Sequence, residues 1–468
     1  PVTERGAVKW LRENLFSGWF NTILTLIGIY VVWSLVTAAL PWWMNSVWTA
    51  NSLSECRAIV VAQAGEGATG ACWAMVNNWW NAFIFGFYPV DGHLLARLFD
   101  AEGFAAAGGY DGLFGPGGDK AAAIAYMNGL RETVPGLWFN LVGYWRPIAA
   151  FLFLIAALSP VLFTGLPRRM LVFTALYPAL CFWLLWGGSV WVPVVAMLGF
   201  VVLGGAYVLL NRSTGPGMAA GVGIVLALLW WLFLDKPLTD ALQGLLPFGL
   251  SSVNSDQFGG FLLAITIGVT AITFSLPLGI LLALGRQSDM LIVKTLCVGF
   301  IEFIRGVPLI TLLFTASLLL QYFLPPNTNF DIILRVIILV TLFAAAYLAE
   351  VIRGGLAALP RGQYEAADAL GLDYWRAQRL IILPQALKIS IPSIVSTFIG
   401  LFKDTTLVAF VGLMDPLKGV TQIVRADINW KGIYWEPYIF VGVIFFVICF
   451  GMSRYSMYLE RKLKTDHR

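Results

Sequence analysis

Residues 365–371 read EAADALG, and after nine further residues positions 381–384 read IILP. The first part predicts a short helix that begins after Pro360. We expect this helix to stop at Gly371, because glycine suits the left-handed conformation in which helices often end.

The alanines of this stretch are its unusual feature. We expect Ala366 and Ala367 to lie on an exposed helix face, where small side chains let another protein's surface approach the backbone closely. A second short helix should begin after Asp373, whose carboxylate can cap it, and end at Pro384. The plain alternative is an ordinary helical hairpin between two membrane-spanning segments.

The composition places this stretch in a membrane protein. Of the 468 residues, 59% are apolar and 12% are charged. The charged share is about half of the roughly 25% that is usual in globular proteins. A single water-soluble core cannot hide this much apolar surface, because such cores stop growing at about 250–300 residues. The chain therefore needs the apolar solvent of a bilayer.

Ten apolar stretches are candidate membrane-spanning helices, so we expect an all-α membrane protein with about ten transmembrane helices. They are Trp19–Ala39, Pro147–Phe163, Met170–Trp186, Val190–Leu210, Met218–Leu234, Phe258–Leu284, Val307–Leu324, Ile332–Val351, Ile389–Phe410 and Tyr438–Met457. A long polar interval at about 41–146 follows the first stretch and contains a weakly helical segment at 92–104. No signal-peptide cleavage pattern precedes the first stretch, which we expect to be retained as a membrane helix.

Lysine and arginine residues predict the orientation, because they accumulate in cytoplasmic loops. If the N-terminus is cytoplasmic, the short outside loops contain only Lys236, Lys418, Arg425 and Lys431. Most other basic residues then lie inside, while the long interval can cross the membrane regardless of its charge. We therefore expect both termini to be cytoplasmic.

Motifs for catalysis and metal binding are missing from the sequence. It has no G-x-x-x-x-G-K-[ST], no H-E-x-x-H and no G-x-S-x-G. Its five cysteines and two histidines form no cluster with metal-ligand spacing. We therefore expect neither an enzyme nor a metal site.

The opening stretch resembles the signature of the permease subunits of bacterial ABC importers. That signature is E-A-A, three residues, G, nine residues and I-x-L-P, found here at Glu365, Ala366, Ala367, Gly371, Ile381, Leu383 and Pro384. Three other segments resemble polar-amino-acid permeases: EFIRGVPL at 302–309, AYLAEVIRGG at 346–355 and LFKDTTLV at 401–408. The resemblance covers about residues 258–463, less than half of the chain.

The resemblance implies a five-helix permease core at residues 258–468, with a cytoplasmic coupling loop at about 360–385. Residues 1–257 would form an N-terminal membrane extension of about five helices, including the outside loop at about 41–146. An enlarged first half of this kind is similar to the M-type permease subunits of the general L-amino-acid importers. Their relatives include glutamate/glutamine/aspartate importers.

Such a subunit implies an ATP-driven importer of L-amino acids in the bacterial inner membrane. The substrates would be polar ones such as glutamate, glutamine and aspartate, or a broad range. This chain would hold no cofactor, because partner ATPase subunits bind ATP and Mg²⁺. The EAA motif occurs once, so the implied partners are a second homologous permease that is a different chain, two ATPase subunits and a periplasmic amino-acid-binding protein. Membrane lipid surrounds such a subunit, and no nucleic-acid partner is implied.

The resemblance assigns the contact with the ATPase to the short loop helix. Its residues are Glu365, Ala366, Ala367, Ala369, Leu370 and Gly371. In this family the loop helix docks in a groove of the ATPase and transmits its motion.

A second group of candidates lies midway along the ninth predicted span. We expect buried charge at Lys403 and Asp404, where each unpaired charge costs about 2.5 kcal/mol or more. Thr405 and Thr406 add hydroxyl groups. These four residues either line the substrate path, meeting the carboxylate and ammonium of an amino acid, or contain an internal ion pair that only fixes the helix.

Two pairs with i, i+3 spacing are expected to be structural. Glu302 with Arg305, and Glu350 with Arg353, lie near cytoplasmic ends of predicted spans, where such spacing favours ion pairs on one helix face.

Cys56 and Cys72 are a candidate disulfide. Both lie in the outside interval, where thiols oxidise. Closing a loop of about 15 residues would stabilise the fold by roughly 3 kcal/mol. The alternative is two free thiols in a mobile loop.

Two other functions are compatible with the residues alone. An ion-coupled secondary transporter would commonly carry internal repeats, and we find none. A membrane-embedded transferase would need paired carboxylates, for which Asp91, Asp100 and Glu102 are the best candidates, although all three are expected to be surface residues.

Overall fold

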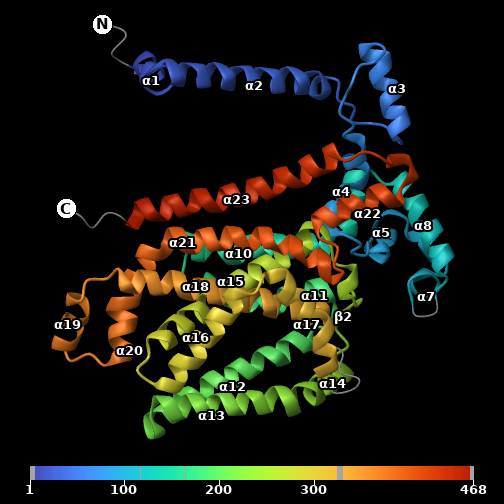
Figure 1. Ribbon diagram of the computed structural model, residues 1–468. Coiled ribbons are helices and arrows are strands. Elements are labelled where there is room, and N and C mark those ends of the chain that lie inside the picture. The colour runs from blue at the N-terminus through green and yellow to red at the C-terminus, as the bar shows by residue number, and fades with distance from the viewer. Residues whose placement is uncertain (1–5, 116–117, 164, 324–329, 464–468) are drawn as a thin grey trace. The chain divides into compact units, whose positions relative to one another are not determined.

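The computed structural model describes residues 6–115, 118–163, 165–323 and 330–463, and it is built almost entirely of helices (Figure 1). The chain divides into two compact units. Unit 1 comprises Pro1–Phe83, Lys388–Lys403 and Pro416–Arg468, and unit 2 comprises Ile84–Leu387 and Asp404–Asp415.

Unit 1 contains the first and the last long membrane helices of the described chain, α2 (Trp19–Met44) and α23 (Trp435–Leu463). It also holds all or most of α1 (Gly6–Asn14), α3 (Leu53–Ala64), α4 (Ala74–Phe85), α21 (Leu383–Asp404), α22 (Pro416–Ala426) and the 3₁₀ turn η6 (Ile428–Trp430). Buried Ala71, Trp73 and Val76 pack with Ile439 and Phe440 of α23. The segment after the first membrane helix is therefore held against the last one.

Unit 2 begins with a small helical domain built from the predicted outside interval. Its helices are α5 (Gly92–Phe99), α6 (Ala101–Ala106), α7 (Gly109–Leu113), α8 (Lys120–Thr133) and α9 (Gly136–Gly143). They enclose an apolar core that includes Leu95, Phe104 and Leu130. Three helices start on an aspartate cap, since Asp91, Asp100 and Asp119 accept backbone N–H groups of α5, α6 and α8. The predicted helical segment at 92–104 is thus two helices, divided where Asp100 caps the second.

The other elements of unit 2 are mostly long and apolar. They are α10 (Trp145–Leu162), α11 (Met170–Trp186), β1 (Gly188–Ser189), α12 (Trp191–Thr214), α13 (Pro216–Leu229), η2 (Trp230–Leu234), α14 (Asp235–Leu245), β2 (Gly249–Leu250), η3 (Ser255–Gln257), α15 (Gly260–Gln287), α16 (Leu291–Gly306), α17 (Leu309–Phe323), α18 (Ile332–Ala357), α19 (Gly362–Ala369), α20 (Tyr374–Ala377), η4 (Gln378–Ile382) and η5 (Thr405–Val411). The two short strands β1 and β2 pair antiparallel.

Eight helical spans in the described residues are long and apolar enough to cross a membrane. Helix α16 and the start of α17 form a ninth candidate, bent by 101°. The remaining predicted span is α11, an apolar helix of 17 residues. All ten predicted stretches therefore lie largely on helices, apart from Leu324, which is outside the described residues. The prediction of an all-α membrane protein is confirmed.

Helices α15 and α18 pack closely in unit 2 because small residues meet between them. A Cβ atom built on Gly279 would lie 2.8 Å from Leu348 Cβ and 3.2 Å from the Ala345 carbonyl oxygen. Ala283 and Ala349 are also fully buried. Small residues of this kind let membrane helices approach each other.

The second loop helix was predicted to end at Pro384, and this is wrong. Helix α20 continues through the π-helical turn η4 into α21, with Pro384 as the second residue of α21. The Leu383 N–H bonds the Gln378 carbonyl, so the backbone has shifted to i→i−5 bonding just before the proline. Such turns rearrange the helical hydrogen bonds, which makes the missing N–H of proline tolerable.

Candidate functional site

The loop helix α19 ends as the sequence predicts. Gly371 has a φ of +66°, the left-handed conformation, and its N–H bonds the Asp368 carbonyl at 2.9 Å. The Asp373 carboxylate then accepts the Arg376 N–H at 3.0 Å and caps α20. Gln385 donates to Gln363 Oε1 at 2.8 Å, which ties α19 to the beginning of α21. The loop is therefore a hydrogen-bonded unit with a defined turn.

The two alanines of this helix have opposite environments. Ala366 and Ala369 are exposed, whereas Ala367 is 2% exposed. The expectation that Ala367 belongs to the exposed face is therefore wrong: successive residues of a helix point about 100° apart, and this one turns toward the chain itself.

Large apolar side chains are exposed in the same loop as these alanines. Leu370 is 72% exposed, Trp375 is 65% exposed and Leu380 is 64% exposed. Sequence reasoning included Leu370 but missed the other two. Trp375 could have been singled out from the sequence, because a tryptophan is unusual in a polar interval that precedes a proline-containing helix. Apolar side chains this exposed indicate a surface that another molecule covers.

A cluster of five charged side chains lies at one end of α15, α16 and α18. Arg286 is 2.8 Å from Glu302 Oε1 and 2.9 Å from Glu350 Oε1. Glu350 Oε2 is 3.0 Å from Arg353 and 3.6 Å from Arg305. The predicted Glu350–Arg353 pair is therefore present within a larger network.

The predicted pairing of Glu302 with Arg305 differs from the observed contacts. Arg286 of α15 reaches Glu302 instead, because its planar guanidinium lies between the carboxylates of two neighbouring helices. Sequence spacing within one helix could not reveal a partner that arrives from another helix. Glu350 is the centre of the cluster, contacting three arginines with a side chain that is 16% exposed.

The predicted polar patch lies where α21 ends. The helix changes from α to 3₁₀ geometry between Asp404 and Thr405. Thr405 is fully buried, but Lys403 is exposed, so the expectation of buried charge at Lys403 is wrong for this chain. Its position on the helix turns it away from the chain's own core.

Cys56 and Cys72 form a disulfide in unit 1. Both are nearly fully buried, and the Cys72 N–H donates to the Glu436 carboxylate at 2.7 Å. Trp79 donates through its indole N–H to Asp427 at 3.2 Å. Polar contacts therefore join the Cys72 end of the disulfide to the start of α23, and join α4 to the turn before it. The role of Glu436 was missed, because its partner is 364 residues away in the sequence.

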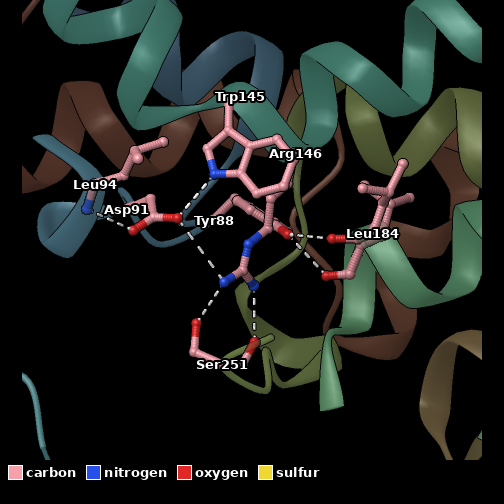
Figure 2. A network of polar contacts seen from close by, with 8 residues as sticks. Tyr88, Asp91, Leu94, Trp145, Arg146, Leu184 and Ser251 are labelled. Atoms are coloured by element: carbon pink, nitrogen blue, oxygen red, sulfur yellow. Dashed lines mark hydrogen bonds and ion pairs between the residues drawn. The ribbon is translucent and has the colours of Figure 1, made fainter. Parts of the chain in front are cut away.

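Arg146 is the centre of a buried polar network in unit 2 (Figure 2). Arg146 is 7% exposed, and its side chain donates to the Ser251 carbonyl at 2.8 Å and to Ser251 Oγ at 2.7 Å. It also lies 4.0 Å from Asp91 Oδ2, which accepts the Trp145 indole N–H at 2.8 Å. The network fastens the small domain to the beginning of α10 and to the segment after β2.

Tyr88 borders this network and bonds the chain at the end of α11. Its hydroxyl donates to the Leu185 carbonyl at 2.8 Å. Burial raises the pKa of Tyr88 to about 12, against the opposing effect of the Arg146 guanidinium. The phenol therefore remains a neutral hydrogen-bond donor at physiological pH.

The candidate carboxylates of a transferase have structural roles instead. Asp91 and Asp100 are half-buried helix caps, and Asp100 also accepts the Tyr126 hydroxyl at 2.8 Å. The expectation that both are surface residues is therefore wrong, whereas Glu102 is exposed.

Comparisons with known proteins extend over the whole chain. The family described as "Binding-protein-dependent transport system inner membrane component" matches residues 275–465. The glutamate/glutamine/aspartate/asparagine transport system permease protein BztC of Rhodobacter capsulatus is 61% identical over 100% of this chain and 96% of its own. The inner membrane amino-acid ABC transporter permease protein YhdY of Escherichia coli K12 is 34% identical over 98% of this chain and 94% of its own.

Among solved structures, an amino acid ABC transporter crystallised with histidines is 30% identical. It matches 43% of this chain and 90% of its own, with a TM-score of 0.38.

Proposed function

Because this chain belongs to the permease subunits of amino-acid ABC importers, we propose that it imports polar L-amino acids, with glutamate, glutamine, aspartate and asparagine as the first candidates. The observation that carries the proposal is 61% identity along the entire chain, extension included, to a permease named for those four substrates. The chain is a multi-pass membrane transporter subunit and not an enzyme, and it works with separate ATPase and binding-protein subunits. Family membership excludes the ion-coupled secondary transporter and the transferase.

The arrangement of partners is a further part of the proposal. A second, different permease chain completes the path, two ATPase subunits supply ATP hydrolysis with Mg²⁺, and a periplasmic protein delivers the amino acid. Residues 258–468 form the permease core and residues 1–257 the extension. Both termini are cytoplasmic, which the distribution of lysine and arginine supports.

The coupling step is assigned to α19 and its surroundings. Glu365, Ala366, Ala369, Leu370 and Gly371 form the exposed contact with the ATPase, while Ala367 packs inward and holds the helix. Closure of the ATPases on ATP would move this helix, and the hydrogen-bonded loop would pass the motion to α21. Exposed apolar side chains in the same loop, Leu370, Trp375 and Leu380, support a docking role.

The substrate path is assigned to the end of α21. Exposed Lys403 provides a cation for a substrate carboxylate, and Asp404, Thr405 and Thr406 provide acceptors and hydroxyls where the helix changes geometry. We expect Lys403→Met to abolish uptake while the complex still assembles. Lys431→Met, the same charge removal at an exposed lysine that directly follows η6, serves as the control for general effects of charge removal.

The decisive experiment is transport by the whole complex in proteoliposomes. The permease is reconstituted with its partner permease, ATPases and binding protein, and uptake of radiolabelled glutamate, glutamine, aspartate, asparagine and leucine is measured with and without ATP. We expect ATP-dependent uptake of the first four. Uptake of leucine alone would contradict the substrate assignment, and normal glutamate uptake by the Lys403→Met complex would remove Lys403 from the path.

A further inference from the structure

Three backbone segments of unit 2 meet immediately before α15 begins. They are Gly86 from the extension, Phe258 and Gly259 from the start of the core, and Met414 from the chain that follows η5. Gly86 pairs antiparallel with Phe258, and Gly259 pairs parallel with Met414, whose carbonyl accepts the Gly260 N–H at 2.8 Å. The three segments therefore lie side by side in the manner of strands, at a place that we call the glycine junction.

The glycine junction has no room for a side chain on either glycine. A Cβ atom built on Gly86 would lie 2.3 Å from Gly259 Cα, and Gly86 has a φ of +69°, which other residues rarely adopt. A Cβ atom on Gly259 would lie 2.9 Å from both Gly86 Cα and the Met414 carbonyl oxygen. Nonbonded carbon atoms prefer a separation of about 3.5–4.0 Å. A methyl group on either glycine would therefore push the segments apart.

Aromatic residues of the extension fix Gly86 from both sides. Phe85 stacks on Tyr144 with 4.6 Å between the ring centroids, and both rings are buried. Tyr88, whose hydroxyl is hydrogen-bonded at the end of α11 (Figure 2), meets the ring of fully buried Phe258 edge to face at 5.5 Å. The extension therefore presents Gly86 to the core in a defined position.

On its other side the glycine junction ends the segment that begins with the proposed path residues. Helix η5 packs against α15 and α17, and its residues Thr405 and Val408 are at most 1% exposed. Gly412 then turns the chain with a φ of +98°, and Met414 enters the junction. A 3₁₀ helix of seven residues is unusually long, and such stretches often mark a hinge or a strained sequence. The geometry of η5 therefore depends on how its far end is held.

We propose that the extension positions the substrate path through the glycine junction, with Gly86 as the positioning residue that holds η5 by way of Gly259 and Met414. This inference rests on the assignment of Thr405 and Thr406 to the path. Gly86 itself meets no substrate. When the junction is loosened, η5 exchanges its 3₁₀ hydrogen bonds for other geometries, and the threonine hydroxyls lose their fixed positions. ATP hydrolysis then continues while fewer amino acids are moved.

The ratio of amino acids imported to ATP hydrolysed tests the proposal in proteoliposomes that contain the whole complex. We expect Gly86→Ala to lower this ratio several-fold in complexes that still assemble and still hydrolyse ATP. The matched control is Gly109→Ala in the small helical domain, because Gly109 has a similar φ of +62° but no atom near its Cβ position. This control adds the same backbone strain without the collision, and it should keep the ratio.

Gly259→Ala repeats the test from the core side if the Gly86→Ala complex does not assemble. Gly259 has an extended backbone with a φ of −165°, so alanine adds the collision without the backbone strain. We expect the same fall in the ratio.

A second measurement follows η5 directly and does not need transport. Thr406→Cys is introduced into a chain whose free cysteines are replaced by serine, and its rate of modification by a small methanethiosulfonate reagent is measured in the assembled complex. We expect Gly86→Ala to raise this rate several-fold and Gly109→Ala to leave it unchanged. The rate at Lys236→Cys, an exposed position outside η5, should be the same in all backgrounds.

Three results would overturn the proposal. An unchanged modification rate at Thr406→Cys in the Gly86→Ala complex would show that η5 does not depend on the glycine junction. Loss of uptake and ATP hydrolysis in equal proportion would reduce the junction to a contact that only supports folding. Faster modification with an unchanged ratio would show that the junction holds η5 but that η5 does not form the path, which overturns the path assignment.

Discussion

Ala366 and Ala367 are adjacent residues whose side chains face different surroundings, and this difference separates coupling from folding. An exposed alanine can be enlarged with little effect on the chain's own stability, usually within about 0.5 kcal/mol. A buried alanine cannot, because overpacking costs typically about 1–3 kcal/mol. The same substitution at the two positions therefore distinguishes a docking surface from a packed hairpin.

We expect Ala366→Trp to leave the thermal unfolding midpoint of the detergent-solubilised permease unchanged and to abolish ATPase association and ATP-driven uptake. Ala367→Trp, in contrast, should lower the unfolding midpoint. Both are measured by a thermal shift assay and by co-purification of the ATPase subunit. Full ATPase binding by the Ala366→Trp variant would show that the coupling contact lies elsewhere.

Tyr88 contributes to the free energy of unfolding, and this contribution is lost at alkaline pH. Its pKa is raised from 10.0 to about 12, so between those values the unfolded chain loses the phenolic proton while the folded chain keeps it. Stability that is fully present below pH 10 is therefore lost as the pH rises toward 12, by up to roughly 2–3 kcal/mol. We expect Tyr88→Phe to be less stable than the wild type at pH 8, and the difference to shrink above pH 10. A difference that stays constant from pH 8 to 12 in denaturation curves would contradict this.

The charged cluster around Glu350 joins helices α15, α16 and α18 at one end. Its pairs are unequal: Glu350 is mostly buried among three arginines, whereas the Glu302 side chain is 53% exposed and faces Arg286. Exposed ion pairs contribute little to stability. Removing a buried carboxylate that several arginines share leaves their charges uncompensated.

Glu350→Gln should therefore destabilise the packing of α15, α16 and α18, by less than the roughly 3–5 kcal/mol that breaking a fully buried pair costs, because the three arginines are partly exposed. Glu302→Gln, the matched neutralisation in the same cluster, should change stability little. The measurement is the unfolding midpoint of each purified variant at low and high salt. Equal effects of the two substitutions would mean that the cluster does not depend on Glu350 as its centre.

For the whole molecule, the length of continuous apolar stretches was sufficient to predict nearly all of the membrane-spanning helices. Two sources of error explain what was missed. Partners that lie far apart in the sequence left no local signal: the Arg146–Ser251 and Cys72–Glu436 contacts belong to this class. The other source of error was the direction in which a residue points around its helix axis. Composition alone could not tell that Ala367 faces inward or that Lys403 faces outward.

The proposed orientation can be tested with single cysteines in a background where Cys181, Cys297 and Cys449 are replaced by serine and the disulfide is kept. Lys236→Cys and Arg376→Cys introduce exposed thiols in segments that charge assigns to opposite sides. A membrane-impermeant maleimide should label the first in intact cells and the second only after lysis. The reverse pattern would invert the assignment of both termini.

The bond between Cys72 and Glu436 has a consequence for biosynthesis. Ribosomes add about 5–20 residues per second, so roughly 20–70 seconds separate the synthesis of its two ends. The disulfide closes a short local loop, so oxidation can be complete before the last helix exists. During that delay the face of the segment around Cys72 that later packs against α23 is exposed. Attachment to α23 is therefore a late step in the maturation of each copy, and chains that terminate early should be recognised there by quality-control proteases.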